Sequence, residues 1–508
     1  MATTTHREVE RKYEATRTTE LPSWSSVFDD EPLVQQQELL ATYLDTADLR
    51  LAGAKITLRF RTGDDETGWH LKLPAGKDTR DEIQVHTTAD EQVGSPPGEL
   101  AQLLRTITRG APLQPIAELR TSRRLLRWTD PAGRDLLEVT DDNVTARVLP
   151  DGPENSWREI EIELGADGDL RLLEKVDSVL RKSGVQRSSS ASKLARALGD
   201  RAPKPPKPVS GPKAEAGEVV LAYVRDQVAA IRRYDVEVRR DSHDSVHQLR
   251  VATRRARSAL QAYGTLIDRE RTRHLTDELK WLAGVAGEAR DLEVLRERFT
   301  VAIDAQPPED VLGAVAPRLV SWFAPRQAKA RKLLLSALDS KRYLALLDSL
   351  DALLADPPFT PLAHRRASKV LPVQLGRTFK RMRRHMAVAD THTGAERDLE
   401  LHEVRKAGKR VRYATEAARP ALGAAADELI SHTKDVQEVL GDHQDAVVAA
   451  PVLRDLAIAA ARGRENAFTW GVLYGLETSK GVDEAALAPA WVGLRQAAKQ
   501  VCRYPQGN

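Results

Sequence analysis

The first 198 residues contain many short runs in which apolar and polar residues alternate. Such alternation is typical of β-strands whose two faces meet different surroundings. Apolar residues follow helical spacing instead near residues 98–109 and 169–183. The alternating runs are REVERKYEA, KITLRFRT, GWHLKLP, DEIQVHT, DLLEVTD and WREIEIEL. So many strands in a small region predict a barrel or a strongly curved sheet with a few flanking helices.

The second half of the chain follows a different period. Residues 199–213, GDRAPKPPKPVSGPK, are rich in proline and lysine and predict an exposed, semi-rigid linker. After them alanine, leucine, arginine and glutamate recur at 3.6-residue spacing, which predicts an all-helical region. The expected fold class is therefore α+β: an antiparallel β-barrel tunnel with flanking helices over residues 1–198, the linker, and a helical domain over 214–508.

An internal repeat divides the helical region. Gly287 and Asp291 recur as Gly441 and Asp445, 154 positions later. A basic motif recurs in the same way, 155 positions apart: its first copy is His247, Arg250, Arg254, Arg255 and Arg257, and its second is His402, Arg405, Lys409, Arg410 and Arg412. Two sets of matches at nearly one offset predict a duplicated bundle with pseudo-symmetric halves, roughly 214–355 and 360–508.

The polar faces of the predicted strands carry an unusual number of charges. Adjacent carboxylates on one strand repel each other, whereas the apolar faces opposite need cover that a few helices provide only in part. A closed barrel with its charges inside explains both, and a divalent cation would make the carboxylates tolerable. Oxygen ligands without histidine–cysteine clusters indicate Mg²⁺ or Mn²⁺. The inward charges are Glu8, Glu10, Lys12, Arg59, Arg61, Lys72, Glu138, Asp142, Glu159, Glu161 and Glu163.

These segments resemble the CYTH superfamily, the triphosphate tunnel metalloenzymes. Glu8–Lys12 matches its ExExK signature, and YLDT, LRFR, HLKLP, EVTDD, EIEIEL and SSSASKLARAL follow in the family's order over residues 5–198. The resemblance implies metal binding by Glu8, Glu10, Glu161 and Glu163, joined by Glu138 and Asp142, with Asp141 as the alternative to the last two. It implies phosphate binding by Lys12, Arg59, Arg61, Lys72, Lys193 and Arg124, with Arg123 or Arg127 as alternatives to Arg124. Glu159 would add a metal-binding or water-positioning group, and the catalytic set would be Glu8, Glu10, Lys12 and Glu159.

The basic motifs of the helical region form two stripes. Their spacings of three, four and three residues place each set on one side of a helix. Such stripes are often solvated surface, but here few acidic residues share them, so stacked like charges favour a polyanion partner. Because aromatic residues other than Tyr413 are absent from the stripes, bare phosphate chains are favoured over nucleic acid. Basic residues near Arg365 and Lys380–Arg384 could extend this surface.

The duplication resembles the CHAD domain, a histidine-rich helical domain often found beside CYTH domains. HQLRVATRRAR and HEVRKAGKRVR match its paired basic motifs, and GEARDLEV and GDHQDAVV match its turns. The resemblance implies inorganic polyphosphate binding by both motifs, including Lys406. Metal chelation by the histidines is disfavoured, because each stripe offers one histidine followed by arginines.

Composition adds few restrictions. The 508 residues carry a net charge of only +3, so the distribution of charge is more informative than its total. The single cysteine, Cys502, favours a reducing, cytoplasmic compartment. No signal-like or membrane-spanning apolar run is visible. Polyphosphate granules are the second expected location.

The sequence thus predicts a metal-dependent triphosphatase acting on tripolyphosphate or a related triphosphate, with polyphosphate bound by the helical domain. The main alternative is a non-catalytic polyphosphate-binding or targeting protein. An adenylyl cyclase or a thiamine triphosphatase ranks lower, because no sequence feature indicates a base pocket. Chain-length preference, the general base and the oligomeric state are left open.

Overall fold

The computed structural model describes residues 3–76, 78–87 and 94–502 and divides into two compact units, residues 1–206 and 207–508. The division falls inside the segment 199–213 predicted as a linker. Within that segment Val209 packs against the helical core and the Gly211 amide donates to the Pro420 carbonyl, so its end belongs to the second unit. Residues 1–2, 77 and 88–93 of the expected first domain and 503–508 of the second lie outside the described residues.

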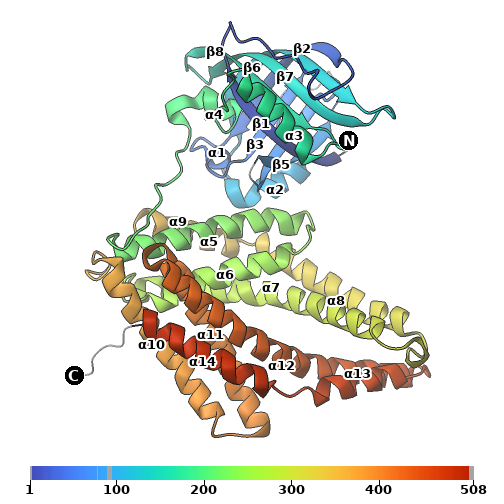
Figure 1. Cartoon of the computed structure of the whole chain (residues 1–508), viewed down its shortest axis with the longest axis vertical. Helices are drawn as coiled ribbons and strands as arrows, with labels where there is room; N and C mark the ends of the chain where they lie inside the picture. The colour runs from blue at the N-terminus through green and yellow to red at the C-terminus, as the bar shows by residue number, and fades with distance from the viewer. Residues whose placement is uncertain (1–2, 77, 88–93, 503–508) are drawn as a thin grey trace. The chain divides into compact units, whose positions relative to one another are not determined.

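The first unit is an antiparallel barrel, as predicted (Figure 1). Among the described residues its strands close in the order β1-β5-β4-β3-β2-β6-β7-β8. The strands are β1 (Thr3–Ala15), β2 (Leu33–Asp45), β3 (Thr57–Thr62), β4 (Gly68–Gly76), β5 (Thr79–His86), β6 (Gln114–Thr129), β7 (Asp135–Val148) and β8 (Glu154–Leu164). The accompanying helices are α1 (Arg50–Gly53), α2 (Gly98–Thr108), α3 (Leu170–Lys182), α4 (Lys193–Leu198) and the 3₁₀ turn η1 (Gly199–Arg201).

Helix α3 covers part of the barrel's outer surface. Val139, Ile160 and Ile162, on outward positions of β7 and β8, are fully buried in one cluster with Leu173 and Val176 of α3. The helix begins at Asp169, whose carboxylate accepts a hydrogen bond from the Leu172 amide at 2.9 Å. The apolar faces of these strands therefore pack against α3 outside the barrel, and their polar faces point inside.

The barrel interior is not charged throughout. Ala41 lies opposite Arg61 and Leu119, and Leu119 lies opposite Ala146, so these side chains share the inner face. They form a buried cluster with Leu194 of α4. An apolar layer packed on α4 thus fills one end of the barrel, and the charged cavity lies beside it.

The second unit is helical, as predicted. Its elements are α5 (Ala216–Arg239), α6 (Ser245–Ala262), α7 (Arg269–Asp304), η2 (Pro308–Asp310), α8 (Val315–Leu338), α9 (Lys341–Ala355), α10 (Ala367–Ala389), α11 (Gly394–Leu422), α12 (Ala424–Arg462), α13 (Phe468–Ser479) and α14 (Glu484–Val501). Helix α6 packs on α5 and α7 as α11 packs on α10 and α12, and α6 also contacts α11. None of the described helices is long and apolar enough to cross a membrane.

The repeated halves share their hydrophobic core. One buried cluster joins Leu249 of α6 and Leu279 of α7 to Leu375 of α10 and Val411 of α11. A second cluster joins Phe299 of α7 and Phe323 of α8 to Trp470 of α13. Each half therefore completes the core of the other, which fixes the two basic motifs on neighbouring helices.

Candidate active site

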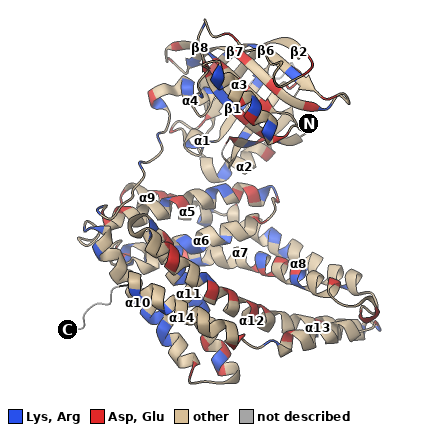
Figure 2. Ribbon diagram, viewed as in Figure 1, with Lys and Arg blue, Asp and Glu red and all other residues tan. Residues whose placement is uncertain are grey.

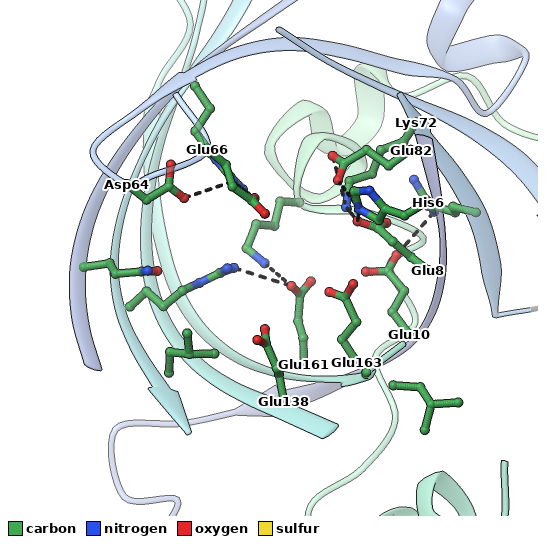
Figure 3. Close-up of a pocket in the computed structure, with 18 of the residues that line it drawn as sticks. His6, Glu8, Glu10, Asp64, Glu66, Lys72, Glu82, Glu138, Glu161 and Glu163 are labelled. Carbon is green, nitrogen blue, oxygen red and sulfur yellow. Dashed lines mark hydrogen bonds and ion pairs between the residues drawn. The ribbon is translucent and has the colours of Figure 1, made fainter. Parts of the chain in front are cut away.

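Strand alternation turns a ring of charged side chains toward the barrel axis. Opposite residues of antiparallel strands share a face, and Glu163 lies opposite both Glu10 and Glu138. On the same face Lys12 lies opposite Glu161. Figure 3 shows carboxylates of β1, β7 and β8 converging on the cavity from one wall.

The cavity has a volume of about 470 Å³. Among the described residues, nine lysines and arginines and ten aspartates and glutamates line it. This near balance explains how so much charge is tolerated inside a barrel. The predicted site residues on its wall are Glu8, Glu10, Lys12, Arg59, Arg61, Lys72, Glu138, Glu161, Glu163 and Lys193.

The three lysines of the cavity are held by carboxylates. Lys72 donates to both oxygens of Glu8, at 2.8 and 2.7 Å, and Lys12 donates to Glu10 at 2.9 Å and also to Glu161. Lys193, the first residue of α4, lies 2.8 Å from Glu161. Burial opposes the charge on Lys72, but Glu8 and Glu82 raise its pKa above the usual value. These lysines are therefore charged.

The carboxylates of β1, β7 and β8 that line the cavity, here named the carboxylate wall, are Glu8, Glu10, Glu138, Glu161 and Glu163. Glu163 differs from the other four. Among the described residues it has no lysine, arginine or histidine within ion-pair distance. Burial and the nearby Glu8, Glu10 and Glu138 raise the pKa of Glu163 to about 8. Burial acts on Glu10 too, but Lys12, Lys72 and Arg80 overcome it and lower the pKa of Glu10 to about 2. The wall thus has one carboxylate more than its lysines and arginines neutralise.

His6 marks a second group of possible ligands. One ligand atom each of His6, Glu8 and Glu82 lies within 4.8 Å of the other two. Hydrogen bonds to Glu8 and Glu82 raise the pKa of His6 to about 10, so a proton occupies the position between these carboxylates. His70 also contacts Glu82, with Nδ1 3.0 Å from Oε1, but burial lowers the pKa of His70.

The helical unit gathers basic residues of both motifs in one place, here named the central basic cluster: Arg250, Arg254, Arg405, Lys409 and Arg412. Arg250 pairs with Asp291 of α7 at 2.7 Å, and its counterpart Arg405 lies 3.9 Å from Asp445 of α12. Among the described residues, Lys409 and Arg254 have no such carboxylate partner. Burial and the four arginines lower the pKa of Lys409 to about 6. The cluster therefore carries positive charge that the protein does not neutralise.

Comparison with known proteins assigns both units. Residues 6–198 match the CYTH domain and residues 222–454 match the CHAD domain. The Mycobacterium tuberculosis proteins Rv2226 (strain H37Rv) and MT2285 (strain CDC 1551) are each 38% identical to this chain over 488 residues, 92% of either chain. The chain belongs to the CYTH–CHAD family.

Solved structures resemble single domains of this CYTH–CHAD protein. PptA from Streptomyces chartreusis is 21% identical, with a TM-score of 0.43, and the match covers 56% of this chain and 100% of that one. The CHAD domain from the plant Ricinus communis is 26% identical, with a TM-score of 0.45, over 59% and 96% of the two chains. HpAC1 from Hippeastrum, described as having a dominant triphosphatase activity, is 17% identical, with a TM-score of 0.27, over 39% and 97%.

Membership of the CYTH family implies dependence on a divalent metal ion. The carboxylate wall fits such an ion, because a cation among Glu8, Glu10, Glu138 and Glu163 would remove the repulsion that raises the pKa of Glu163. All four supply oxygen ligands, which Mg²⁺ prefers. The group around His6 fits less well, because the histidine would first have to lose its proton.

The structure corrects one predicted phosphate ligand. Arg124 is exposed on the outer face of β6, opposite Asp141. Arg123 and Arg127, the stated alternatives, line the cavity instead. Arg123 donates to both oxygens of Asp142 at 2.8 Å. The error arose because three arginines in RTSRRLLRW fit the motif and the position of the strand's inner face was not fixed.

Asp142 and Glu159 lie inside the barrel, but behind the cavity wall rather than on it. Asp142 is fully buried between Arg123 and Lys193, and Glu159 contacts Lys193 at 2.8 Å. Asp142 lies on the inner face of β7, as the alternation of the strand predicted. Asp142 is in position to orient Lys193 and Arg123, and Glu159 to orient Lys193. Their predicted roles in binding metal or positioning water stay predictions.

Several lining residues escaped the sequence analysis. Glu82 and Arg80 occupy inner positions of β5, on the face opposite that of Ile83 and Val85. The alternation in DEIQVHT already separates these faces, so it would have placed Glu82 on the inner face. His6, Gln35, Gln37 and Tyr43 also line the cavity, and they lack any charge pattern that would distinguish them.

The remaining predicted residues of the CHAD domain are not members of the central basic cluster, although Arg255 shares Glu416 with Arg412 of the cluster. Arg255 is paired with Glu416 at 3.0 Å, and the exposed Lys406 with Glu403 at 2.7 Å. Burial lowers the pKa of His247 and of His402, and His402 Nδ1 lies 2.5 Å from the Gln444 side-chain oxygen. Arg410 lines a different pocket of the same domain. The structure thus brings five of the eleven predicted residues into one cluster.

Proposed function

We propose that the CYTH domain hydrolyses inorganic tripolyphosphate or a related triphosphate with Mg²⁺ or Mn²⁺, and that the CHAD domain binds inorganic polyphosphate. The observation that carries the first part is the division of the cavity into paired cations and a carboxylate wall with the unpaired Glu163. Anion binding alone would need the cations but gains nothing from that wall. The second part rests on the central basic cluster.

Substrate binding on this view is an exchange of partners. Lys72 and Lys12 would release Glu8 and Glu10 and take phosphate oxygens, while the released carboxylates would take the metal ion. Because each buried charge keeps an opposite partner, the exchange avoids leaving an unpaired charge at low dielectric. Arg59 and Arg123 would add bidentate contacts along the chain.

Hydrolysis would then depend on positioning and charge stabilisation. A bound divalent cation supplies positive charge against the negative charge that develops on the transferred phosphoryl group. The basic residues of the cavity hold the phosphate chain in one register, and carboxylates not engaged with the metal orient the attacking water.

A cyclase activity has little support from the cavity. Among its described lining residues Tyr43 is the only phenylalanine, tyrosine or tryptophan, and burial of a purine ring would need an apolar or aromatic surface. ATP is therefore expected to bind through its phosphates alone.

Phosphate release by the full-length protein tests the enzyme proposal. Tripolyphosphate, ATP and thiamine triphosphate are offered with Mg²⁺, with Mn²⁺ and with EDTA. We expect release from tripolyphosphate only with metal. Absence of turnover on every substrate and metal, by protein that binds tripolyphosphate, would support the non-catalytic alternative instead.

Binding of long-chain polyphosphate tests the CHAD proposal separately. The isothermal titration of the full-length protein is compared with that of an Arg254→Ala/Lys409→Ala variant. We expect the variant to lose most of the binding but to keep tripolyphosphate turnover. Unchanged affinity would overturn this part without touching the first.

A further inference from the structure

The CHAD domain contains a second basic pocket, separate from the central basic cluster. It has a volume of about 580 Å³ and lies between the end of α6, the start of α7, and α10 and α11. We name it the side pocket and define it by five arginines on its wall: Arg269, Arg273, Arg377, Arg381 and Arg410. Glu270 and Asp277 also line it, so positive charge is in excess. Figure 2 shows the band of basic residues on α10.

The arginines of the side pocket are not neutralised by the protein. Among the described residues, none of the five has a carboxylate within 4.0 Å; Arg377 instead contacts the side-chain oxygen of Gln374 at 3.2 Å. Burial and the nearby Arg381 and Arg257 lower the pKa of Arg410. Arg410 is half-buried, whereas the other four arginines are exposed. Like charges gathered around one pocket without an opposite partner favour the binding of an anion.

The internal repeat provides a comparison within the same molecule. Arg410 of α11 corresponds to Arg255 of α6, and Gln261 of α6 corresponds to Glu416 of α11, both at the offset of 155 positions. Beside Arg255, Glu416 accepts hydrogen bonds from Arg255 and from the Tyr223 hydroxyl, the latter at 2.9 Å. Beside Arg410, the position equivalent to that acid is Gln261, which lines the side pocket.

The same change of charge continues on the neighbouring helices. Counted from the first residues of α5 and α10, Tyr223 corresponds to Gln374, Asp226 to Arg377 and Ala230 to Arg381. On α7, Arg273 corresponds to Asp427 of α12, 154 positions later. The position beside Arg255 is thus filled by Glu416 and Tyr223. The equivalent position beside Arg410 is an open pocket lined by arginines.

We propose that the side pocket is a separate binding site for a compact, multiply charged phosphate compound such as a short oligophosphate. The arginines supply bidentate donors for phosphate oxygens. The α7 N-terminus is already capped, because Asp268 accepts from the Glu270 and Arg271 amides, so arginine side chains rather than backbone amides hold the anion. No aromatic residue lines the pocket in the described chain, so a nucleobase would add no affinity. The proposal is independent of turnover in the barrel.

Arginine footprinting of the full-length protein tests the proposal. Phenylglyoxal modification is followed by peptide mapping, with and without tripolyphosphate, in EDTA. We expect tripolyphosphate to slow modification of Arg410 and Arg377 by about tenfold, the scale of a bidentate guanidinium–phosphate contact. ATP should protect them no better than tripolyphosphate. Failure of tripolyphosphate to protect either arginine in the wild-type protein would overturn the proposal.

Three variants separate the side pocket from the central basic cluster. Protection should persist in Arg254→Ala/Lys409→Ala, vanish in Arg273→Ala/Arg381→Ala, and be unchanged in the control Arg326→Ala, an exposed arginine of α8. Loss of protection in the first variant would show that the pocket only extends the path of a chain bound centrally. Protection by long-chain polyphosphate but not by tripolyphosphate would contradict a separate site in the same way.

Discussion

The cavity of the CYTH domain and the central basic cluster of the CHAD domain both gather lysine and arginine, but they balance the charge differently. Among the described residues, each of the three lysines that line the barrel cavity has a carboxylate partner, and the carboxylate wall contains an unpaired acid, Glu163. In the cluster the unpaired groups are bases, Lys409 and Arg254. The first arrangement suits a metal ion together with a polyanion, whereas the second suits a polyanion alone.

This difference has a structural origin. Strand pairing places β1 between two neighbours, so Glu10 and Lys12 meet the glutamates of β8 at fixed register. Helices α6 and α11 instead bring two copies of one basic motif together, because the duplicated halves share a core. Duplication of a basic stripe doubles the charge without supplying acids. Among the described residues, acids outside the two motifs, such as Asp291 and Glu416, compensate part of it.

The largest expected effect concerns the carboxylate wall. Glu8→Gln keeps the shape of the side chain but removes a charge that holds Lys72 and that the metal ion would need. We expect tripolyphosphate hydrolysis to fall by ~10²–10³-fold or more, while polyphosphate binding by the CHAD domain is retained. Phosphate release and titration calorimetry on the same preparation measure both. Equal loss of hydrolysis and of polyphosphate binding would contradict the assignment of these two functions to separate domains.

Two adjacent arginines of β6 give a matched pair for the barrel. Arg123 points inward to Asp142, whereas Arg124 is exposed outside. We expect Arg123→Ala to lower kcat/KM for tripolyphosphate by about 10–100-fold, because the variant loses one bidentate contact to the substrate. Arg124→Ala should stay within about twofold, as is usual for surface positions. Steady-state kinetics decide, and a larger effect at Arg124 would reverse the assignment of the inner face.

Substitution of Lys409 should separate stability from binding in the CHAD domain. Lys409→Met removes a partly buried amine that lies among four arginines and replaces it with an apolar side chain of similar length. We expect the free energy of unfolding to rise by about 1 kcal/mol, with weaker polyphosphate binding at pH 6. Thermal unfolding and calorimetry test this pair of results. A lower free energy of unfolding in the variant would contradict the view that Lys409 destabilises the folded domain.

The last prediction is a pH dependence of polyphosphate binding. Lys409 has a pKa of about 6 in the free protein, and a bound polyanion would raise it, so binding at pH 7–8 takes up a proton. Affinity should fall as pH rises from 6 to 8, by at most about tenfold per pH unit for one proton. Titrations in buffers of different ionisation enthalpy count the protons, and Lys409→Met serves as the control. Proton release, or the same uptake in the variant, would exclude this explanation.

The same pKa fixes the sign of the effect on stability. Between pH 6 and the usual lysine pKa near 10.4 the unfolded chain binds more protons at position 409 than the folded protein does. The contribution of Lys409 to the free energy of unfolding therefore rises with pH across this window.

Much of this architecture was predictable because it depends on periodicity. Alternation in REVERKYEA and WREIEIEL separates inner from outer positions, so Glu8, Glu10, Lys12, Glu161 and Glu163 were placed on the cavity wall correctly. The repeat offset likewise predicted the duplicated helices. Where the alternation was applied only to hydrophobic residues, as in DEIQVHT, Glu82 was missed.

The rest depends on contacts between segments far apart in the chain. Nothing in RTSRRLLRW fixes which arginine faces inward, because that depends on the pairing of β6 with β2 and β7. Similarly, the stripe of α6 does not show that Arg255 is neutralised by Glu416 from the other half. Charge patterns predict that a basic residue is present, whereas its partner is decided by the fold.

A crystal of the full-length protein soaked with tripolyphosphate and Mn²⁺ tests the central claim most directly, through the anomalous signal of the metal. The account predicts a manganese peak among Glu8, Glu10, Glu138 and Glu163, with phosphate density on Lys12, Lys72 and Arg59. Phosphate density in the barrel with no manganese peak at that wall, at metal concentrations that support turnover, would contradict it.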